Sequence, residues 1–230
     1  MSYIGNKPAN KAVVASDLDP AVITGQTALA VAPADTDEFL ISDAGVLKRL
    51  DASLIGGGAT TLLSTATVSS AVSEVDITSN IDSTYKNYML ILTDVKSASD
   101  GVRFKIQYFS SSGSPDTGSV YMYAGKGLRS DNVDIVVDSA GTTQGDISIA
   151  ACSVDAGHRH NQFVIYLFNP SGTDSYKQMT STAQQTVADN KAVSGLISNT
   201  YMRTVAVTGI RFKMASGNIT RGTFKLFGIS

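Results

Sequence analysis

From residue 60 to the end of the chain, short runs of alternating apolar and polar residues are separated by Gly, Ser, Asn and Asp. A period of two places the apolar side chains on one face of a β-strand, and no helical period is present. Many short, evenly spaced strands are typical of two packed antiparallel sheets, most simply a jelly roll. We therefore predict an all-β antiparallel sandwich, with strands at residues 62–68, 74–78, 88–94, 102–109, 120–124, 133–137, 147–154, 163–168, 177–182, 192–197, 204–213 and 223–229.

The last stretch of the chain has the pattern of a closing element. Two amphipathic segments, residues 210–214 and 222–229, flank an Ala-Ser-Gly-Asn turn at residues 215–218. Turn residues between two alternating runs are typical of a β-hairpin. We therefore predict that a hairpin completes the sheet.

Residues 1–58 have a different pattern. Pro8, Pro20 and Pro33 interrupt short apolar clusters. Proline removes an amide donor and blocks continuous helix or sheet, which favours an extended arm that becomes ordered against a partner.

A compact hairpin is predicted within this arm, at residues 39–50. Its strands are residues 39–42 and 46–50, and Gly45 in the turn between them is expected to take a positive φ. A lone two-stranded hairpin is marginally stable in water, so we expect other copies or another protein to stabilise it. Glycines at 56–58 are then a flexible joint to a head domain at residues 59–230.

The composition leaves few groups for chemistry: no Trp, two His, one Cys and 17% charged residues. The net charge of −2 and the scattered cations argue against a nucleic-acid partner. The apolar runs are too short for a signal peptide or a membrane span, so we expect a soluble protein made in a cytoplasm. Cys152 has no disulfide partner and has the setting of a small core residue. No cofactor is expected.

Two groups of motifs resemble bacteriophage proteins. The segments Ile23-Thr-Gly-Gln-Thr-Ala-Leu29, Pro33-Ala-Asp-Thr-Asp37 and 39–50 are similar to the amino-terminal attachment region of tail-fibre-like virion proteins. The opening Met1-Ser-Tyr-Ile-Gly5 is similar to openings common in phage fibre proteins. Further motifs resemble a jelly-roll domain that recurs in phage structural proteins, and they lie at residues 63–73, 80–85, 167–170, 210–213, 216–218 and 222–229.

The resemblance implies a non-enzymatic virion structural protein of a tailed phage, made in the host cytoplasm. It would be a capsid decoration, a head fibre or a tail-fibre component; the alternative is a receptor-binding adhesin that recognises a host surface glycan. Because one chain cannot cover its own hairpin, we expect a homotrimer. The residues expected to dock on capsid or tail proteins are Ile23, Leu29, Phe39, Leu40, Ile41, Val46, Leu47 and Leu50.

The best candidate for ligand recognition is the segment that contains Tyr121, Tyr123, Lys126 and Arg129. Aromatic rings stack on sugars, and the two cations are suited to anionic groups on a bacterial surface. The competing interpretation is that alternating tyrosines on a sheet face serve packing or subunit contact.

A metal site is a weaker hypothesis. His158 and His160 are two residues apart, so on a strand they point to the same face, with Asp155 nearby. In a trimer three such pairs would meet on the axis. The competing interpretation is a solvated loop. Residues 131–138 contain carboxylates but lack the oxygen-ligand spacing of a calcium loop.

Catalytic hypotheses are weaker still. Cys152 with His158 would be a thiol and its base, but no cation near Cys152 lowers its pKa. Asp134 and Asp138 would be paired carboxylates for glycoside cleavage, but strand-end charges are usually a solvated rim. No helix follows Gly125-Lys-Gly127 to bind a phosphate. We therefore predict that the protein is not an enzyme.

Overall fold

The structure is a computed structural model that describes residues 25, 27, 33–34, 36–55, 60–110, 112–154 and 160–230. The chain divides into two compact units, Met1–Gly57 and Gly58–Ser230. Of the arm predicted at residues 1–58, residues 1–24, 26, 28–32 and 35 and the glycine joint at 56–58 lie outside the described residues.

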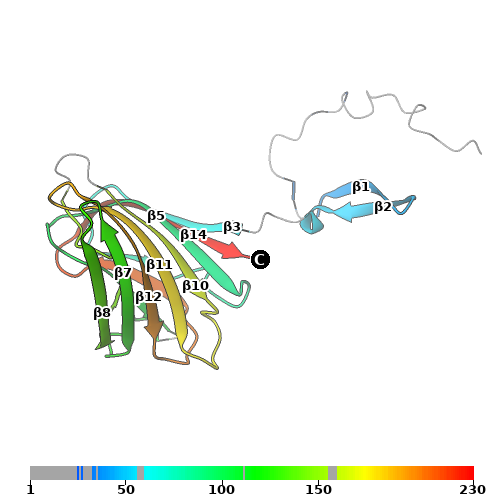
Figure 1. The fold of residues 1–230 in the computed structure, drawn as a ribbon. Coiled ribbons are helices and arrows are strands. Elements are labelled where there is room, and N and C mark those ends of the chain that lie inside the picture. The colour runs from blue at the N-terminus through cyan, green and yellow to red at the C-terminus, as the bar shows by residue number, and fades with distance from the viewer. Residues whose placement is uncertain are drawn as a thin grey trace, which may run out of the picture. The chain divides into compact units, whose positions relative to one another are not determined.

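The smaller unit contains an antiparallel hairpin of β1 (Glu38–Asp43) and β2 (Val46–Asp51), followed by the short 3-10 helix η2 (Ala52–Leu54) (Figure 1). Both turn residues have positive φ, 50° at Ala44 and 81° at Gly45. Two such residues make the tight turn whose twist matches that of the flanking strands. The positive φ predicted for Gly45 is therefore confirmed.

The larger unit is a sandwich of two antiparallel sheets, which confirms the predicted all-β class. Figure 1 shows strands of the larger sheet side by side. The eight-stranded sheet has the order β3 (Thr60–Val68), β14 (Ile219–Ile229), β5 (Asn87–Ser97), β10 (Asn161–Phe168), β11 (Lys177–Thr186), β12 (Ala192–Tyr201), β7 (Tyr121–Arg129) and β8 (Asp134–Thr142). The four-stranded sheet has the order β4 (Glu74–Ile77), β13 (Gly209–Met214), β6 (Phe104–Phe109) and β9 (Gly145–Asp146). The finer assignment as a jelly roll stays a prediction.

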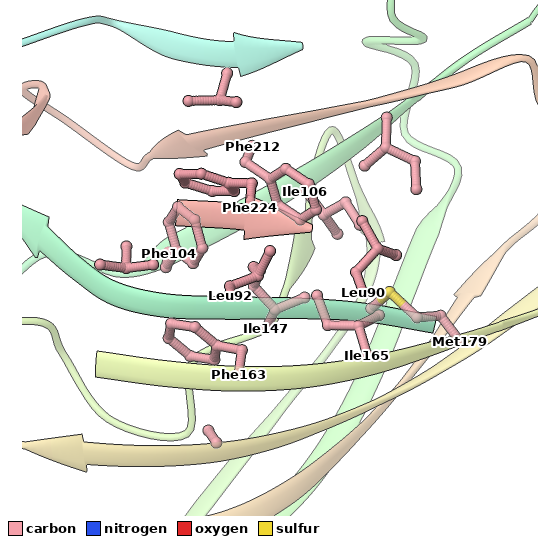
Figure 2. Packing of buried hydrophobic residues seen from close by; sticks show 14 of the residues in the cluster. Leu90, Leu92, Phe104, Ile106, Ile147, Phe163, Ile165, Met179, Phe212 and Phe224 are labelled. Atoms are coloured by element: carbon pink, nitrogen blue, oxygen red, sulfur yellow. The ribbon is translucent and has the colours of Figure 1, made fainter. Parts of the chain in front are cut away.

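Phenylalanine rings join the two sheets across the core (Figure 2). Phe104 on β6 has its ring centroid 5.2 Å from that of Phe163 on β10 and 6.4 Å from that of Phe224 on β14. Phe212 on β13 stacks on Phe104 at 5.9 Å. All four side chains are buried, and each contributes about 2 kcal/mol by leaving water. Alternation along the strands therefore packs the inner faces of the two sheets together.

The predicted terminal hairpin is wrong. β13 pairs with β4 and β6, whereas β14 pairs with β3 and β5, so the turn between them crosses from one sheet to the other. Alternation reveals that one face of each strand is buried, and both sheets of a sandwich meet that condition. The pattern therefore located the strands without identifying their neighbours.

The strand predicted at residues 147–154 is also wrong. The chain runs beside β6 here, with the amides of Ile147 and Cys152 bonded to carbonyls of Phe104 and Val102. Between them the ladder is interrupted, because the amide of Phe104 donates to the Ser148 hydroxyl at 2.9 Å. We call residues 145–154 the inner segment. Its side chains Ile147, Ile149, Ala150 and Cys152 are buried, and Ile149 lies against the larger sheet.

Candidate functional site

Cys152, the candidate nucleophile, is fully buried in the inner segment. Its Sγ accepts a hydrogen bond from Nε2 of Gln185 at 3.6 Å. Burial, assisted by the negative charge of Asp146, raises the thiol pKa to about 12. A thiol in this state is not a nucleophile at neutral pH. His158, its predicted base, lies outside the described residues.

The predicted carboxylate pair is not arranged for glycoside cleavage. Asp134 and Asp138 are both exposed on β8, four residues apart along the strand, a spacing of roughly 13 Å. Glycosidase carboxylates are about 5–9.5 Å apart. In addition, Asp134 forms an ion pair with Lys126 at 2.7 Å.

The histidine hypothesis concerns residues that the structure describes only in part, whereas residues 131–138 of the calcium hypothesis are all described. His158 and Asp155 lie outside the described residues. Nδ1 of His160 lies 2.7 Å from Oδ1 of Asp94, whose other oxygen lies 2.5 Å from Nε of Arg221. Over the described ranges, no group of three or more His, Cys, Asp or Glu side chains is placed to hold a metal ion together.

The candidate ligand residues do not share one surface. Tyr121 is only 1% exposed, because its ring packs between Tyr108 and Tyr201, with centroids 6.1 and 5.2 Å away. Burial raises the pKa of its hydroxyl, which donates to the carbonyl of Asp116 at 2.8 Å. Its ring therefore cannot stack on a sugar, and the prediction for Tyr121 is corrected.

The other three members of that set are divided between the two faces of the sheet. Tyr123 is two residues after Tyr121 on β7 and so points to the same, inner face of the sheet. Nζ of Lys105 lies 5.3 Å from the centroid of its ring. Lys126 points to the opposite, outer face of the sheet and is exposed. The guanidinium of Arg129 is held by Asp131 and Asp189 at 2.5 and 2.8 Å. The period of two was visible in the sequence, but which face lies against the core was not.

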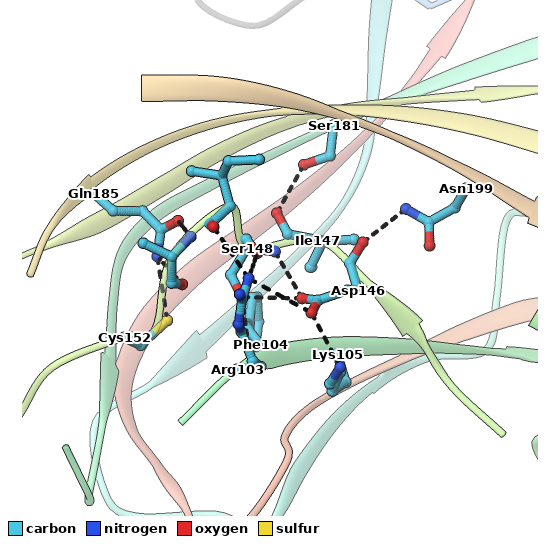
Figure 3. A network of polar contacts seen from close by, with 12 residues as sticks. Arg103, Phe104, Lys105, Asp146, Ile147, Ser148, Cys152, Ser181, Gln185 and Asn199 are labelled. Carbon is cyan, nitrogen blue, oxygen red and sulfur yellow. Dashed lines mark hydrogen bonds and ion pairs between the residues drawn. The ribbon is translucent and has the colours of Figure 1, made fainter. Parts of the chain in front are cut away.

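A buried polar network holds the inner segment in place (Figure 3). Asp146 is 2% exposed, and its carboxylate accepts from the hydroxyl of Ser148 at 3.0 Å and from Nζ of Lys105 at 3.1 Å. Gln185 bonds both the amide and the carbonyl of Ala150 at 3.0 Å. These bonds replace a regular ladder with side-chain contacts, so the network is structural. The sequence pattern did not reveal this network, although Asp146 and Gln185 stand beside apolar residues.

The hairpin exposes large apolar side chains on both faces. Phe39 and Leu40 are adjacent, so they point to opposite faces, and they are 41% and 69% exposed. Val46, on the same face as Phe39, is 58% exposed. Of the other predicted docking residues, Ile41 and Leu50 are half-buried, Leu47 pairs with Ser42, and Ile23 and Leu29 lie outside the described residues.

Ion pairs border the same hairpin. Arg49 lies 2.9 Å from Glu38, and Lys48 pairs with Asp43. Both pairs are exposed and contribute little to stability. These four charged side chains are thus paired with each other. The exposed apolar side chains are the groups that would gain from being covered by a partner protein.

Neither the models of known protein families nor the curated proteins searched contain a match to this chain. In the portion that the structure describes, no helix has the length and apolar character needed to cross a membrane.

Proposed function

We propose that this chain is a non-enzymatic structural protein of a tailed-phage virion, which docks on the particle through its amino-terminal unit and displays its β-sandwich. The observation that carries the proposal is the hairpin with Phe39 and Leu40 exposed on opposite faces. A two-stranded hairpin is marginal alone, and it becomes stable when a partner covers its apolar side chains. Packing against both faces requires contacts with more than one surface.

Association among copies is the simplest way to provide those surfaces. A trimer would bring three hairpins together and leave outward-facing side chains for the capsid or tail. Several weak contacts made at once would then hold the assembly on the particle. The phage origin itself rests on the sequence resemblance of the arm and of the head domain.

The strand order supports a jelly roll as the displayed domain. With the strands β7, β8, β11 and β12 set aside, the larger sheet has the order β3-β14-β5-β10 and the smaller has β4-β13-β6-β9. Among the eight strands that remain, successive strands along the chain lie in opposite sheets. The one exception is β9, which follows β6 of its own sheet. Two Greek keys produce such crossings, and we interpret the other four strands as two insertions that widen one sheet.

The non-enzymatic part of the proposal is supported by the state of the candidate catalytic groups. The thiol of Cys152 is buried and protonated, and Asp134 is paired with Lys126. The carboxylate of Asp146 is buried and is paired with Lys105 at 3.1 Å. An activity assay on host envelope polysaccharide tests this part, and turnover would contradict it.

Incorporation into particles tests the docking role. We expect the full chain to co-purify with virions, and a Phe39→Asp/Leu40→Asp double variant to be lost from them while the unfolding of its head domain is unchanged. Tyr176→Asp is a matched control, because it also replaces an exposed aromatic side chain, on the larger unit. Equal incorporation of the hairpin variant would overturn the proposal. Electron microscopy of labelled full chain on virions would then distinguish capsid from tail.

A further inference from the structure

The outer face of the eight-stranded sheet, on the side away from the four-stranded sheet, is hollowed where β10, β11, β12 and β7 lie side by side. A hollow of about 500 Å³ adjoins one of about 700 Å³. Both are lined by Leu128, Gln184 and Ser194. We call the two hollows together the outer groove; its other lining residues used below are Gln162, Thr182 and Leu196.

A row of side chains crosses the floor of the outer groove. Gln162 pairs with Gln184, Gln184 with Ser194, and Ser194 with Leu128, so the four positions are in register on four neighbouring strands. Neighbouring strands lie about 4.8 Å apart, which gives the row a regular spacing. The exposed amides of Gln162 and Gln184 form no hydrogen bond with any side chain or backbone group among the described residues. Each amide therefore has a donor and an acceptor free for a ligand.

The charged groups around the outer groove are already paired. Nζ of Lys126 lies 2.7 Å from Asp134, and the guanidinium of Arg129 contacts Asp131 and Asp189. The ring of His160, at the margin, contacts Asp94 at 2.7 Å. An anionic ligand would have to displace these carboxylates from their cations. The groove consequently favours an uncharged ligand.

We propose that the outer groove binds an uncharged, linear carbohydrate. Sugar hydroxyls both donate and accept, as the amides of Gln162 and Gln184 and the hydroxyl of Ser194 do. The hydroxyl of Thr182 donates to the carbonyl of Val164 at 3.3 Å and keeps an acceptor position for a sugar. Leu128 and Leu196 supply apolar contact for the C–H faces of the sugar rings, in the usual mixture of apolar walls and a few polar groups. A second copy of the chain is a poorer occupant, because the centre of a protein interface is rich in aromatic side chains and this floor has none.

A further hollow extends the outer face along the same two strands. It has a volume of about 330 Å³ and is lined by Met122, Ala124, Ser198 and Thr200 on β7 and β12. The small side chains of Ala124 and Ser198 leave space above the sheet. A chain of several sugar units would therefore find a continuing surface, which favours a polymer over a single sugar.

The test uses the full chain on an array of neutral and anionic polysaccharides, followed by calorimetry with the best neutral oligosaccharide. We expect Gln184→Ala, which removes an amide common to both hollows, to weaken binding about 10-fold. Gln178→Ala is the matched control: it lies on the same strand and the same face, outside the outer groove, and should bind as the wild type does. Raising the salt from about 50 to 500 mM should change affinity less than two-fold, because no ion pair is formed.

Three results would overturn this inference: no neutral glycan binds, binding falls steeply with salt, or Gln184→Ala binds as tightly as the wild type. Light scattering on Leu196→Lys provides a further check. If this variant changes the mass of the assembly but leaves glycan binding unchanged, the occupant of the outer groove is a second copy of the chain. The inference does not rest on the docking role of the arm. A Phe39→Asp/Leu40→Asp variant should keep its glycan affinity, so failure of one proposal is distinguishable from failure of the other.

Discussion

Ile149 packs directly on the backbone of Gly195: a Cβ atom added at Gly195 would lie 2.7 Å from Cγ1 of Ile149. Gly127 faces Gly195 across β7 and β12, and a Cβ atom there would lie 2.6 Å from the same atom. Real Cβ atoms essentially never approach other atoms so closely. The pair of glycines therefore lets the inner segment lie against the larger sheet.

Gly195→Ala should consequently destabilise the head domain by about 1–3 kcal/mol, because the new methyl group overpacks a filled core. Equilibrium urea unfolding followed by circular dichroism measures the change. Ser198→Ala, on the exposed face of the same strand, is the control and should stay within about 0.5 kcal/mol of the wild type. A Gly195→Ala protein as stable as this control would disprove the steric account.

Ile149 supplies a double-mutant cycle for the same contact. Truncation in Ile149→Ala removes Cγ1 and makes room for the methyl group of Gly195→Ala. The two substitutions together should therefore cost less than the sum of their separate effects, by about 0.5–3 kcal/mol. Strict additivity would mean that the backbone carbonyl of Lys126, also 2.7 Å from the added Cβ, is the dominant obstacle.

The same glycines illustrate what the sequence could predict. Period-two alternation predicted the sandwich class, because it depends only on one buried face per strand. It could not predict that Gly125 and Gly127 are needed for close packing, since the atoms they meet, in Ile197 and Ile149, are far away in the sequence. It also placed residues 147–154 in a strand, because side-chain bonds such as that of Ser148 to Phe104 have no signature in alternation.

The candidate sites were predicted less well for a related reason. Parity along β7 placed Tyr121 and Tyr123 on one face, but only the packing of Tyr108 and Tyr201 makes that face the inner one. The row from Gln162 to Leu128 is assembled from four strands, so its members are adjacent only through strand register. No local motif could have revealed it. The apolar residues of the hairpin, by contrast, are close in sequence, and their docking role stays a prediction.

Asp116 provides a pH-dependent prediction. Burial by itself raises the pKa of Asp116. The amide of Gly118, the hydroxyl of Tyr201 and the guanidinium of Arg203 donate hydrogen bonds to its carboxylate, and together they lower the pKa by more than burial raises it. The pKa therefore lies below its ordinary value of 3.8. A depressed pKa in the folded state adds stability above the unfolded pKa, and that stability is lost as pH falls through the folded pKa.

Asp116→Ala should therefore cost about 1–3 kcal/mol at pH 7, because Tyr201 loses its acceptor in a site where the Asp116 side chain is 19% exposed. The difference from the wild type should shrink as pH falls below about 3.8. Urea unfolding from pH 7 to pH 2.5 measures it. Asp138→Ala, at an exposed position on β8, is the control without this pH dependence. A difference that is constant with pH would refute the assignment.

Cys152 should be inert in the folded protein. With its pKa raised to about 12, roughly one thiol in 10⁴ is ionised at pH 8, and the sulfur is enclosed as well. A chromogenic disulfide reagent should find no reactive thiol within minutes under native conditions and one per chain in guanidinium. Ser198→Cys, at an exposed position, is the control and should react at once. Equal native rates for the two thiols would contradict the buried placement.

The hairpin provides the last prediction, because its two faces can be tested separately. Phe39 and Val46 share one face, and Leu40 lies on the other. If copies associate through the face of Phe39, Phe39→Asp should reduce the mass measured by light scattering to that of one chain, while Leu40→Asp retains the assembly but is lost from virions.

The reverse result would assign self-association to the face of Leu40. Both substitutions lie in the smaller unit. The urea midpoint of the head domain should therefore be unchanged in both variants. The salt bridge of Arg49 with Glu38 is a suitable control, since Arg49→Ala removes an exposed ion pair worth less than about 1 kcal/mol and should alter neither mass nor incorporation. Full assembly and full incorporation in both aspartate variants would show that the apolar faces of the hairpin are not contact surfaces.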